Sequence, residues 1–208
     1  MAPRDAAAAQ AELSTLQEAM RACQRCRKAG YGIVPGAIFQ GEAGARVMLV
    51  GQAPGASELA ANRPFCGPAG RRLFRWLERA GFGEDEFRKR HYIAAVTRCY
   101  PGRRSSGRGD RAPSREEQAL CRPYLDAELE LVSPELILPV GRLAIRAFLG
   151  AKALNEVVGT VSQDEHGRWI VPFPHPSGAS RWFNAPENAA HVDRAIRQLA
   201  RLRRQLAL

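Results

Sequence analysis

Four of the five cysteines are placed so that they could share one metal site. Cys23 and Cys26 form a C-x-x-C pair, and Cys99 and Cys121 are two further thiols with 21 residues between them. Four thiolates can bind zinc or an iron–sulfur cluster. A zinc ribbon would normally repeat the C-x-x-C, so the spacing favours a cluster without deciding it, and a set of buried free cysteines is the alternative. The odd cysteine count argues against a disulfide framework.

Two loops contain the other residue types that could do chemistry. One begins at Gly51, and the other is centred on His175, which lies between two prolines. Its fixed backbone can direct a ring nitrogen into a crevice as a hydrogen-bond donor or acid/base, although a histidine that caps a turn is the alternative. Phe65 follows a proline and could present its ring for stacking or lie in the core. Arg181 and Trp182 would suit a wedge inserted into nucleic acid.

Strands and helices alternate around these loops. The patterns predict strands over 46–51, 91–97, 134–141, 156–163 and 168–173, and helices over 6–28, 69–80, 115–132, 142–149 and 187–206. The crossover between the first two strands predicts that they are parallel. We therefore expect an α/β fold, a three-layer sandwich with a central, mostly parallel sheet of four to five strands flanked by helices. Loops that follow such strands open on the same edge of the sheet, where ligands bind.

Composition points to one domain over residues 1–208 with an anionic partner. The chain is 45% hydrophobic, enough for a buried core. Its net charge of +10 comes mostly from arginine, which suits phosphate recognition, although a genomic arginine bias is the alternative. No apolar run approaches the roughly 18 residues of a membrane span, and the first twenty residues lack a signal-peptide core. We expect a cytoplasmic monomer that does not contact membranes.

A basic stretch over 101–113 has no periodicity and contains four arginines between positions 103 and 111. Arg103 and Arg104 belong to this group. We expect a mobile loop that contacts phosphates or a single strand of nucleic acid. A plain disordered insertion is the alternative.

Five short motifs occur in order along the chain. They are Gly51-Gln-Ala-Pro-Gly55, Arg63-Pro-Phe-Cys-Gly-Pro-Ala-Gly70, Tyr92-Ile-Ala-Ala-Val-Thr-Arg-Cys99, Cys121-Arg-Pro-Tyr-Leu125 and His175-Pro-Ser177. Together they resemble the uracil-DNA glycosylase superfamily, specifically its iron–sulfur branches, often called families 4 and 5. The resemblance covers nearly the whole chain, from about residue 18 to residue 200.

The resemblance implies an enzyme of base excision repair. Such an enzyme flips uracil or a related deaminated base out of DNA, hydrolyses its N-glycosidic bond and leaves an abasic site. The resemblance also implies that Phe65 stacks on the flipped base and that His175 donates to the base O2 as negative charge develops there. Further residues implied in the pocket are Gly51, Gln52, Ala53 and Ser177. The implied ligands of a 4Fe–4S cluster are Cys23, Cys26, Cys99 and Cys121, with Cys66 left out.

Two positions depart from the family pattern. Gln52-Ala53 stands where relatives carry the carboxylate that activates water, so Glu58 becomes the nearest carboxylate for orienting water, with a solvated glutamate as the alternative. Ala94-Ala95 replaces the asparagine that reads the edge of uracil in many relatives, as in family 5, and Asn184 is a possible replacement. Without that amide, discrimination between bases should weaken.

These departures leave a second hypothesis open. The chain would then be an iron–sulfur protein that binds lesions or single-stranded DNA with little or no glycosylase activity. A redox-sensing protein that uses the fold only as a scaffold is a third hypothesis. A related branch traps the base-free sugar on a histidine near position 110, but Asp110 stands there, so we expect no covalent trapping.

Overall fold

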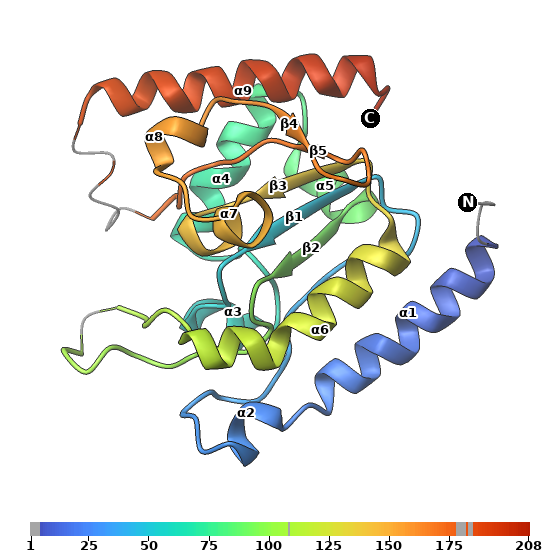
Figure 1. Ribbon diagram of the computed structural model, residues 1–208, viewed down its shortest axis with the longest axis vertical. Helices are drawn as coiled ribbons and strands as arrows, with labels where there is room; N and C mark the ends of the chain where they lie inside the picture. Colours follow the sequence, from blue (N-terminus) through green and yellow to red (C-terminus); the bar gives the residue numbers. More distant parts are fainter. Residues whose placement is uncertain (1–4, 108, 178–181, 183–184) are drawn as a thin grey trace.

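A five-stranded sheet forms the centre of the computed structural model, which describes residues 5–107, 109–177, 182 and 185–208 (Figure 1). Its order is β2-β1-β3-β5-β4. β1 pairs in parallel with β2 and β3, β3 pairs in parallel with β5, and β4 is antiparallel to β5. The strands are β1 (Val47–Gly51), β2 (Tyr92–Ala95), β3 (Leu136–Pro139), β4 (Ser162–Gln163) and β5 (Trp169–Ile170). The mostly parallel sheet confirms the expected fold class.

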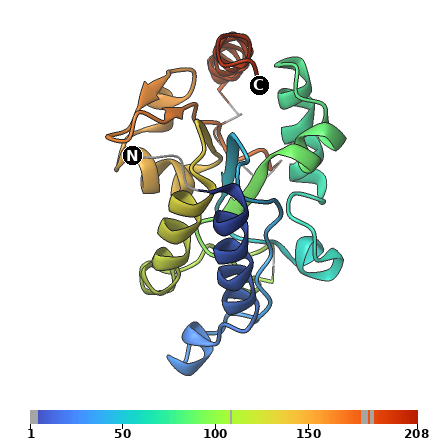
Figure 2. The ribbon, with the colours of Figure 1, turned by 90° about the vertical axis from the view of Figure 1, so that its right-hand side faces the viewer.

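Helices cover both faces of this sheet. The helices of the described residues are α1 (Ala6–Arg21), α2 (Arg25–Lys28), α3 (Ala56–Ala61), α4 (Pro68–Arg79), α5 (Glu84–Arg90), α6 (Arg115–Val132), α7 (Arg142–Leu149), α8 (Leu154–Val157) and α9 (Glu187–Gln205). Figure 2 shows α6 and α4 on opposite sides of the strands. In the described part of the chain, no helix combines the length and the apolar character that crossing a membrane requires.

Alternating side chains of the strands build a core on each face. In β1, Val47 and Leu49 pack into a cluster with residues of α4 and α9, whereas Met48 and Val50 pack into a second cluster with residues of α1 and α6. All five residues of β1 are buried, as expected for a strand covered on both faces. The three predicted layers are therefore present.

Two predicted elements were wrong. The helix expected over 6–28 is interrupted at 22–24, because the N–H of Ala22 closes α1 on Glu18 and the chain turns before α2. The strand expected over 156–163 begins instead with α8, in which the Glu156 carboxylate accepts a hydrogen bond from the Ala153 N–H and starts a helical turn. Ser162–Gln163 is the part of this range that forms a strand.

The sequence patterns also missed two short helices, α3 and α5. α3 lies inside the loop after β1, and α5 joins α4 to β2. Each is too short for apolar periodicity to identify. Acidic residues fill the first turn of α5 and basic residues its last turn, which complements the helix dipole.

The ends of three parallel strands bring the functional loops to one edge. Gly51 is paired with Ala95, and Val50 with Pro139, so β1, β2 and β3 end at the same level. Beyond β3, a parallel bridge between Val140 and Phe173 draws in the chain that leads to His175. The arrowheads of these three strands point the same way in Figure 1. The expectation that both loops open on one edge is confirmed.

Candidate active site and cysteine pocket

Phe65 lies against the end of β1. A Cβ added to Gly51 would be 2.8 Å from the ring Cζ of Phe65, so the ring needs a glycine beneath it. The half-buried ring also packs against the core cluster on the α4 face. Phe65 itself has a φ of 52°, in the left-handed region that residues with a Cβ rarely adopt. The surrounding structure therefore places this ring at the carboxyl edge of the sheet.

His175 lies beside the end of the neighbouring strand, β3. Backbone hydrogen bonds join Phe173 to Pro139 and Gly141, and a Cβ added to Gly141 would lie 3.1 Å from Cδ2 of His175. The Ser177 N–H donates to His175 Nδ1 over 3.3 Å. Burial lowers the pKa of His175. The ring is therefore neutral at pH 7, and because Nδ1 accepts a hydrogen bond, its proton sits on Nε2.

Gln52 and Ala53 continue β1 into the same region. The carbonyls of Gly51 and Gln52 accept hydrogen bonds from the N–H groups of Val96 and Thr97, at 2.9 and 3.2 Å. Gln52 and Ala53 are half-buried, so both can border a pocket at this edge. The adjacent Ala94-Ala95 is buried and offers no side-chain hydrogen-bonding group.

Glu58 lies in α3 and points back into its own loop. One carboxylate oxygen accepts the Gly55 N–H over 2.7 Å, and the other accepts the Phe65 N–H. Burial raises the pKa of this carboxyl group, while the two N–H donors oppose that change. These contacts give Glu58 a structural role in the loop, and its expected contribution to orienting water stays a prediction.

The basic stretch over 101–113, apart from residue 108, folds back on itself as a hairpin, and its expected mobility stays a prediction. Arg103 and Asp110 form an antiparallel bridge, and backbone hydrogen bonds continue it at Arg104. The Asp110 carboxylate accepts from the Tyr100 hydroxyl at 2.7 Å and from the Ala56 N–H at 3.2 Å, which fixes the hairpin beside α3. Arg103 and Arg104 are exposed, so they remain available to phosphates.

Residues after His175 are described in part. Arg181 and Asn184 lie outside the described residues. Trp182 packs against the core, and its indole N–H donates to the side chain of Asn155 in α8. A role for Trp182 as a wedge in DNA would require the ring to leave these contacts, so that role stays a prediction.

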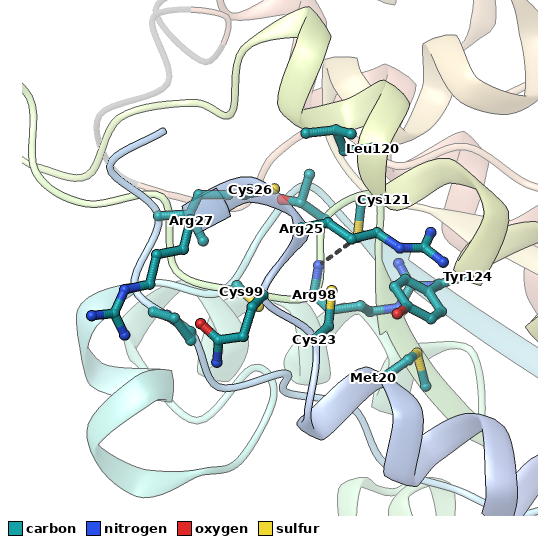
Figure 3. A pocket seen from close by; sticks show the side chains of 14 residues that line it. Met20, Cys23, Arg25, Cys26, Arg27, Arg98, Cys99, Leu120, Cys121 and Tyr124 are labelled. Atoms are coloured by element: carbon teal, nitrogen blue, oxygen red, sulfur yellow. Dashed lines mark hydrogen bonds between the residues drawn. The ribbon is translucent and has the colours of Figure 1, made fainter. Parts of the chain in front are cut away.

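The four cysteines of the predicted metal site line one pocket (Figure 3). Cys23 follows α1, Cys26 lies in α2, Cys99 follows β2 and Cys121 lies in α6. In Figure 3 their sulfur atoms gather around a common space, which is also bordered by Met20, Ile33, Leu120 and Tyr124. All four are free thiols that are partly exposed. Cys66 does not line this pocket.

The chemistry of this pocket suits a cationic group. Burial, with the neighbouring thiolates adding to it, raises the pKa of Cys26 and of Cys99 to about 11. Four thiolates would therefore repel one another unless a positive centre lay between them. Among the described residues, no three His, Cys, Asp or Glu side chains are grouped as a single metal ion requires. A 4Fe–4S cluster takes four Cys thiolates, and the four thiols that line this pocket match that number and type.

Sequence patterns missed a buried arginine between the two sites. The side chain of Arg98 is 1% exposed and donates to Glu128 of α6 and to the carbonyl of Ala95 at the end of β2. Its backbone N–H donates to Cys121 Sγ at 3.4 Å. The apolar run before Arg98 predicted a strand, but no pattern in the sequence indicates that a charged side chain turns into the core.

A model of the uracil DNA glycosylase superfamily matches residues 38–200 of this chain. The chain belongs to the uracil DNA glycosylase superfamily. The match contains the loops of Gly51, Phe65 and His175 together with Cys99 and Cys121, and it begins after Cys23 and Cys26. The resemblance inferred from the five motifs is confirmed.

Several curated members of the superfamily are similar to this chain. A type-4 uracil-DNA glycosylase of Pyrobaculum aerophilum is 36% identical over 150 residues, which are 71% of this chain and 67% of that protein. A type-4 uracil-DNA glycosylase of Thermotoga maritima is 31% identical over 67% of this chain and 69% of its own length. One of Sulfurisphaera tokodaii is 28% identical and covers 90% of this chain and 84% of its own length.

Proposed function

We propose that this protein is a DNA glycosylase that removes uracil, or a related deaminated base, by hydrolysing its N-glycosidic bond. The observation that carries the proposal is the placement of Phe65 and His175 at the ends of adjacent parallel strands, β1 and β3. Superfamily membership and relatives named as type-4 uracil-DNA glycosylases support it.

The proposed reaction begins with a base extruded from the DNA stack. The ring of Phe65, seated on Gly51, stacks on the extruded base. The bond between C1′ of the sugar and the base nitrogen breaks, and its electron pair leaves with the base. The Nε2–H of His175 donates to the base oxygen on which this negative charge accumulates. Water adds its oxygen to C1′ and loses a proton to solvent, the departed base anion takes up a proton from solvent, and an abasic site remains.

We assign the orienting of this water to Gln52, which stands where many relatives have a carboxylate. Its amide oxygen can accept a hydrogen bond from water and orient it, but an amide does not take up a proton at neutral pH. We therefore place most of the rate enhancement on stabilisation of the leaving base rather than on activation of water. Since Ala94-Ala95 provides no amide to the base edge, we expect bases other than uracil to be accepted.

We propose that Cys23, Cys26, Cys99 and Cys121 hold a 4Fe–4S cluster. When bound, the cluster would supply a covalent link between the N-terminal segment, the end of β2 and α6. The residues themselves hold the thiols in place: Arg25 of α2 lies over the Tyr124 ring of α6 at 4.6 Å, and Arg98 ties β2 to α6. We also propose that the protein acts as a monomer in the cytoplasm, with its exposed arginines on DNA phosphates.

The alternative is a protein that binds damaged or single-stranded DNA and cleaves little or none of it. The amide at position 52, where many relatives have a carboxylate, is the observation that favours it. This alternative shares the DNA-binding surface and the cysteine pocket with the first proposal. The two therefore differ in bond cleavage alone.

One assay separates these functions. Labelled oligonucleotides with a single uracil, hypoxanthine or xanthine are incubated with the protein and then treated with alkali, which breaks the strand at abasic sites. We expect breaks at the modified base, and a loss of at least about 100-fold in their rate in His175→Ala. Binding of the same oligonucleotides without any breaks would support the alternative and overturn the enzyme proposal.

A further inference from the structure

The backbone of Phe65 requires an explanation beyond the stacking role of its ring. A φ of 52° is rare for a phenylalanine, and yet it aims the ring at Gly51. A Cβ at Gly70 would be only 1.8 Å from the Phe65 carbonyl oxygen, so the first turn of α4 lies directly against this peptide. An unusual backbone angle persists only where neighbouring groups hold it. Two charged side chains do so here.

Arg88 of α5 holds the carbonyl side of this segment. Its side chain is 4% exposed, and its Nη1 and Nη2 donate to the carbonyls of Pro64 and Phe65 at 2.9 and 3.1 Å. Its Nε donates to Glu84 at 2.8 Å, and the guanidinium lies 4.4 Å from the ring centroid of Phe74. The planar guanidinium thus reaches two successive carbonyls at once, which a lysine ammonium cannot do in the same geometry.

Glu58 of α3 holds the amide side of the same residue. Its carboxylate joins the Phe65 N–H to the Gly55 N–H, and both charge-assisted bonds lie in a half-buried region. The N–H and the C=O of Phe65 are therefore fixed from opposite sides, by an anion on α3 and a cation on α5. We call Glu58 and Arg88 together the Phe65 clamp.

We propose that the Phe65 clamp is a positioning device that sets the stacking ring on Gly51 before a base enters the pocket. Arg88 and Glu58 touch the backbone of Phe65 and reach the base only through its ring. The proposal rests on the proposed function, since it assigns the clamp to the same pocket. Holding the ring in advance removes the cost of ordering it when the flipped base arrives.

The test is a double-mutant cycle between Arg88→Lys and Phe65→Ala. Single-turnover rates on a uracil oligonucleotide are measured for the wild type, both single variants and the double variant. We expect Arg88→Lys to lower the rate by about tenfold in the wild-type background and by less than about twofold when Phe65 is alanine. Arg79→Lys is the matched control, since Arg79 is an exposed α4 arginine paired with Asp193, and we expect no change from it.

A purely structural role for Arg88 would give a different pattern. Equal losses in the two backgrounds, or no loss in the wild-type background, would overturn the proposal. Thermal unfolding of each variant shows whether it is folded. If Arg88→Lys does not fold, Glu58→Gln takes its place in the cycle, because the amide keeps one acceptor for the two N–H groups.

The fluorescence of 2-aminopurine placed beside the uracil reports extrusion of the base without cleavage. If no bond is broken, this fluorescence is measured on binding for the same four proteins of the double-mutant cycle. Absence of cleavage in the wild type would count against the proposed function alone. A 2-aminopurine signal reduced by Arg88→Lys only when Phe65 is present would still support the clamp, and a signal reduced equally in both backgrounds would contradict it.

Discussion

Two features of the structure set the protonation state of His175: its burial and a hydrogen bond from its own loop. Burial lowers its pKa, which removes the positive charge at neutral pH, and the Ser177 N–H fixes which ring nitrogen carries the proton. A neutral imidazole with its N–H at Nε2 can donate to a developing anion. It is not consumed as an acid in doing so.

The pH dependence of the rate follows from this state of His175. In the proposed reaction the active form is the neutral ring, and burial lowers the pKa of His175 below the ordinary value of 6.5. Single-turnover rates should therefore stay constant as the pH falls from 8 to about 6.5 and decrease only at lower pH. A rate that rises as the pH falls through this range would show that the cationic ring is the active form. The measurement uses the uracil oligonucleotide, with folding verified at each pH.

At this scale the sequence predicted individual residues far better than their contacts. Phe65 and His175 lie at the expected edge of the sheet, and the four cysteines line one pocket. The sequence did not predict the buried partners, Arg88 and Arg98. An arginine usually indicates an exposed position, and its burial depends on carbonyls and carboxylates supplied by segments far away in the chain.

Among the elements, α6 contributes residues both to the cysteine pocket and to the buried ion pair of Arg98. It begins with a capping box between Ser114 and Glu117, and it supplies Cys121 to the pocket and Glu128 to Arg98. Cys121 and Glu128 are seven residues apart and so lie on one helical face. A long periodic helix of this kind is predictable, whereas the one-turn helix α8 begins with a local contact between Glu156 and the Ala153 N–H, which apolar periodicity does not detect.

The contribution of α6 to the metal site can be tested by Cys121→Ser. We expect this change to lower the bound iron and the visible absorbance of the purified protein by most of their wild-type values, because one ligand of the proposed cluster is lost. Cys66→Ser is the matched control, since Cys66 does not line the pocket. Iron measured chemically in both variants decides the matter. Equal iron in Cys121→Ser and the wild type would contradict the assignment.

At the scale of the whole molecule, a buried histidine links stability to pH. His91 lies between α5 and β2 and is 6% exposed, and its ring centroid is 4.8 Å from that of Phe87 and 5.7 Å from that of Phe82. Its Nδ1 has no hydrogen-bond partner among the described residues. Burial lowers the pKa of His91 from 6.5 to about 4. Between these values the unfolded chain binds a proton that the folded protein does not.

The free energy of unfolding should therefore decrease as the pH falls from about 6.5 to about 4. The full gap corresponds to roughly 3 kcal/mol, and above pH 6.5 this histidine contributes no pH dependence. His91→Phe should reduce the decrease, whereas His166→Gln, at an exposed histidine, should not. Urea unfolding at several pH values measures both. If the free energy of unfolding decreases equally with falling pH in His91→Phe and in the wild type, His91 is excluded as the cause.

The short connection between the proposed base pocket and the cysteine pocket constrains how this protein can change. Three residues separate Ala95, at the end of β2, from Cys99, and Arg98 among them is tied to Ala95 and to α6. An insertion or a deletion between Ala95 and Cys99 would shift these two residues relative to each other. It would therefore disturb a proposed cluster ligand together with the proposed base-facing end of β2. We therefore expect new base preferences to arise by substitution at positions 94 and 95 rather than by a change of loop length. Within this branch of the fold, we expect side-chain identity to vary at this edge while its spacing to the cysteine stays fixed.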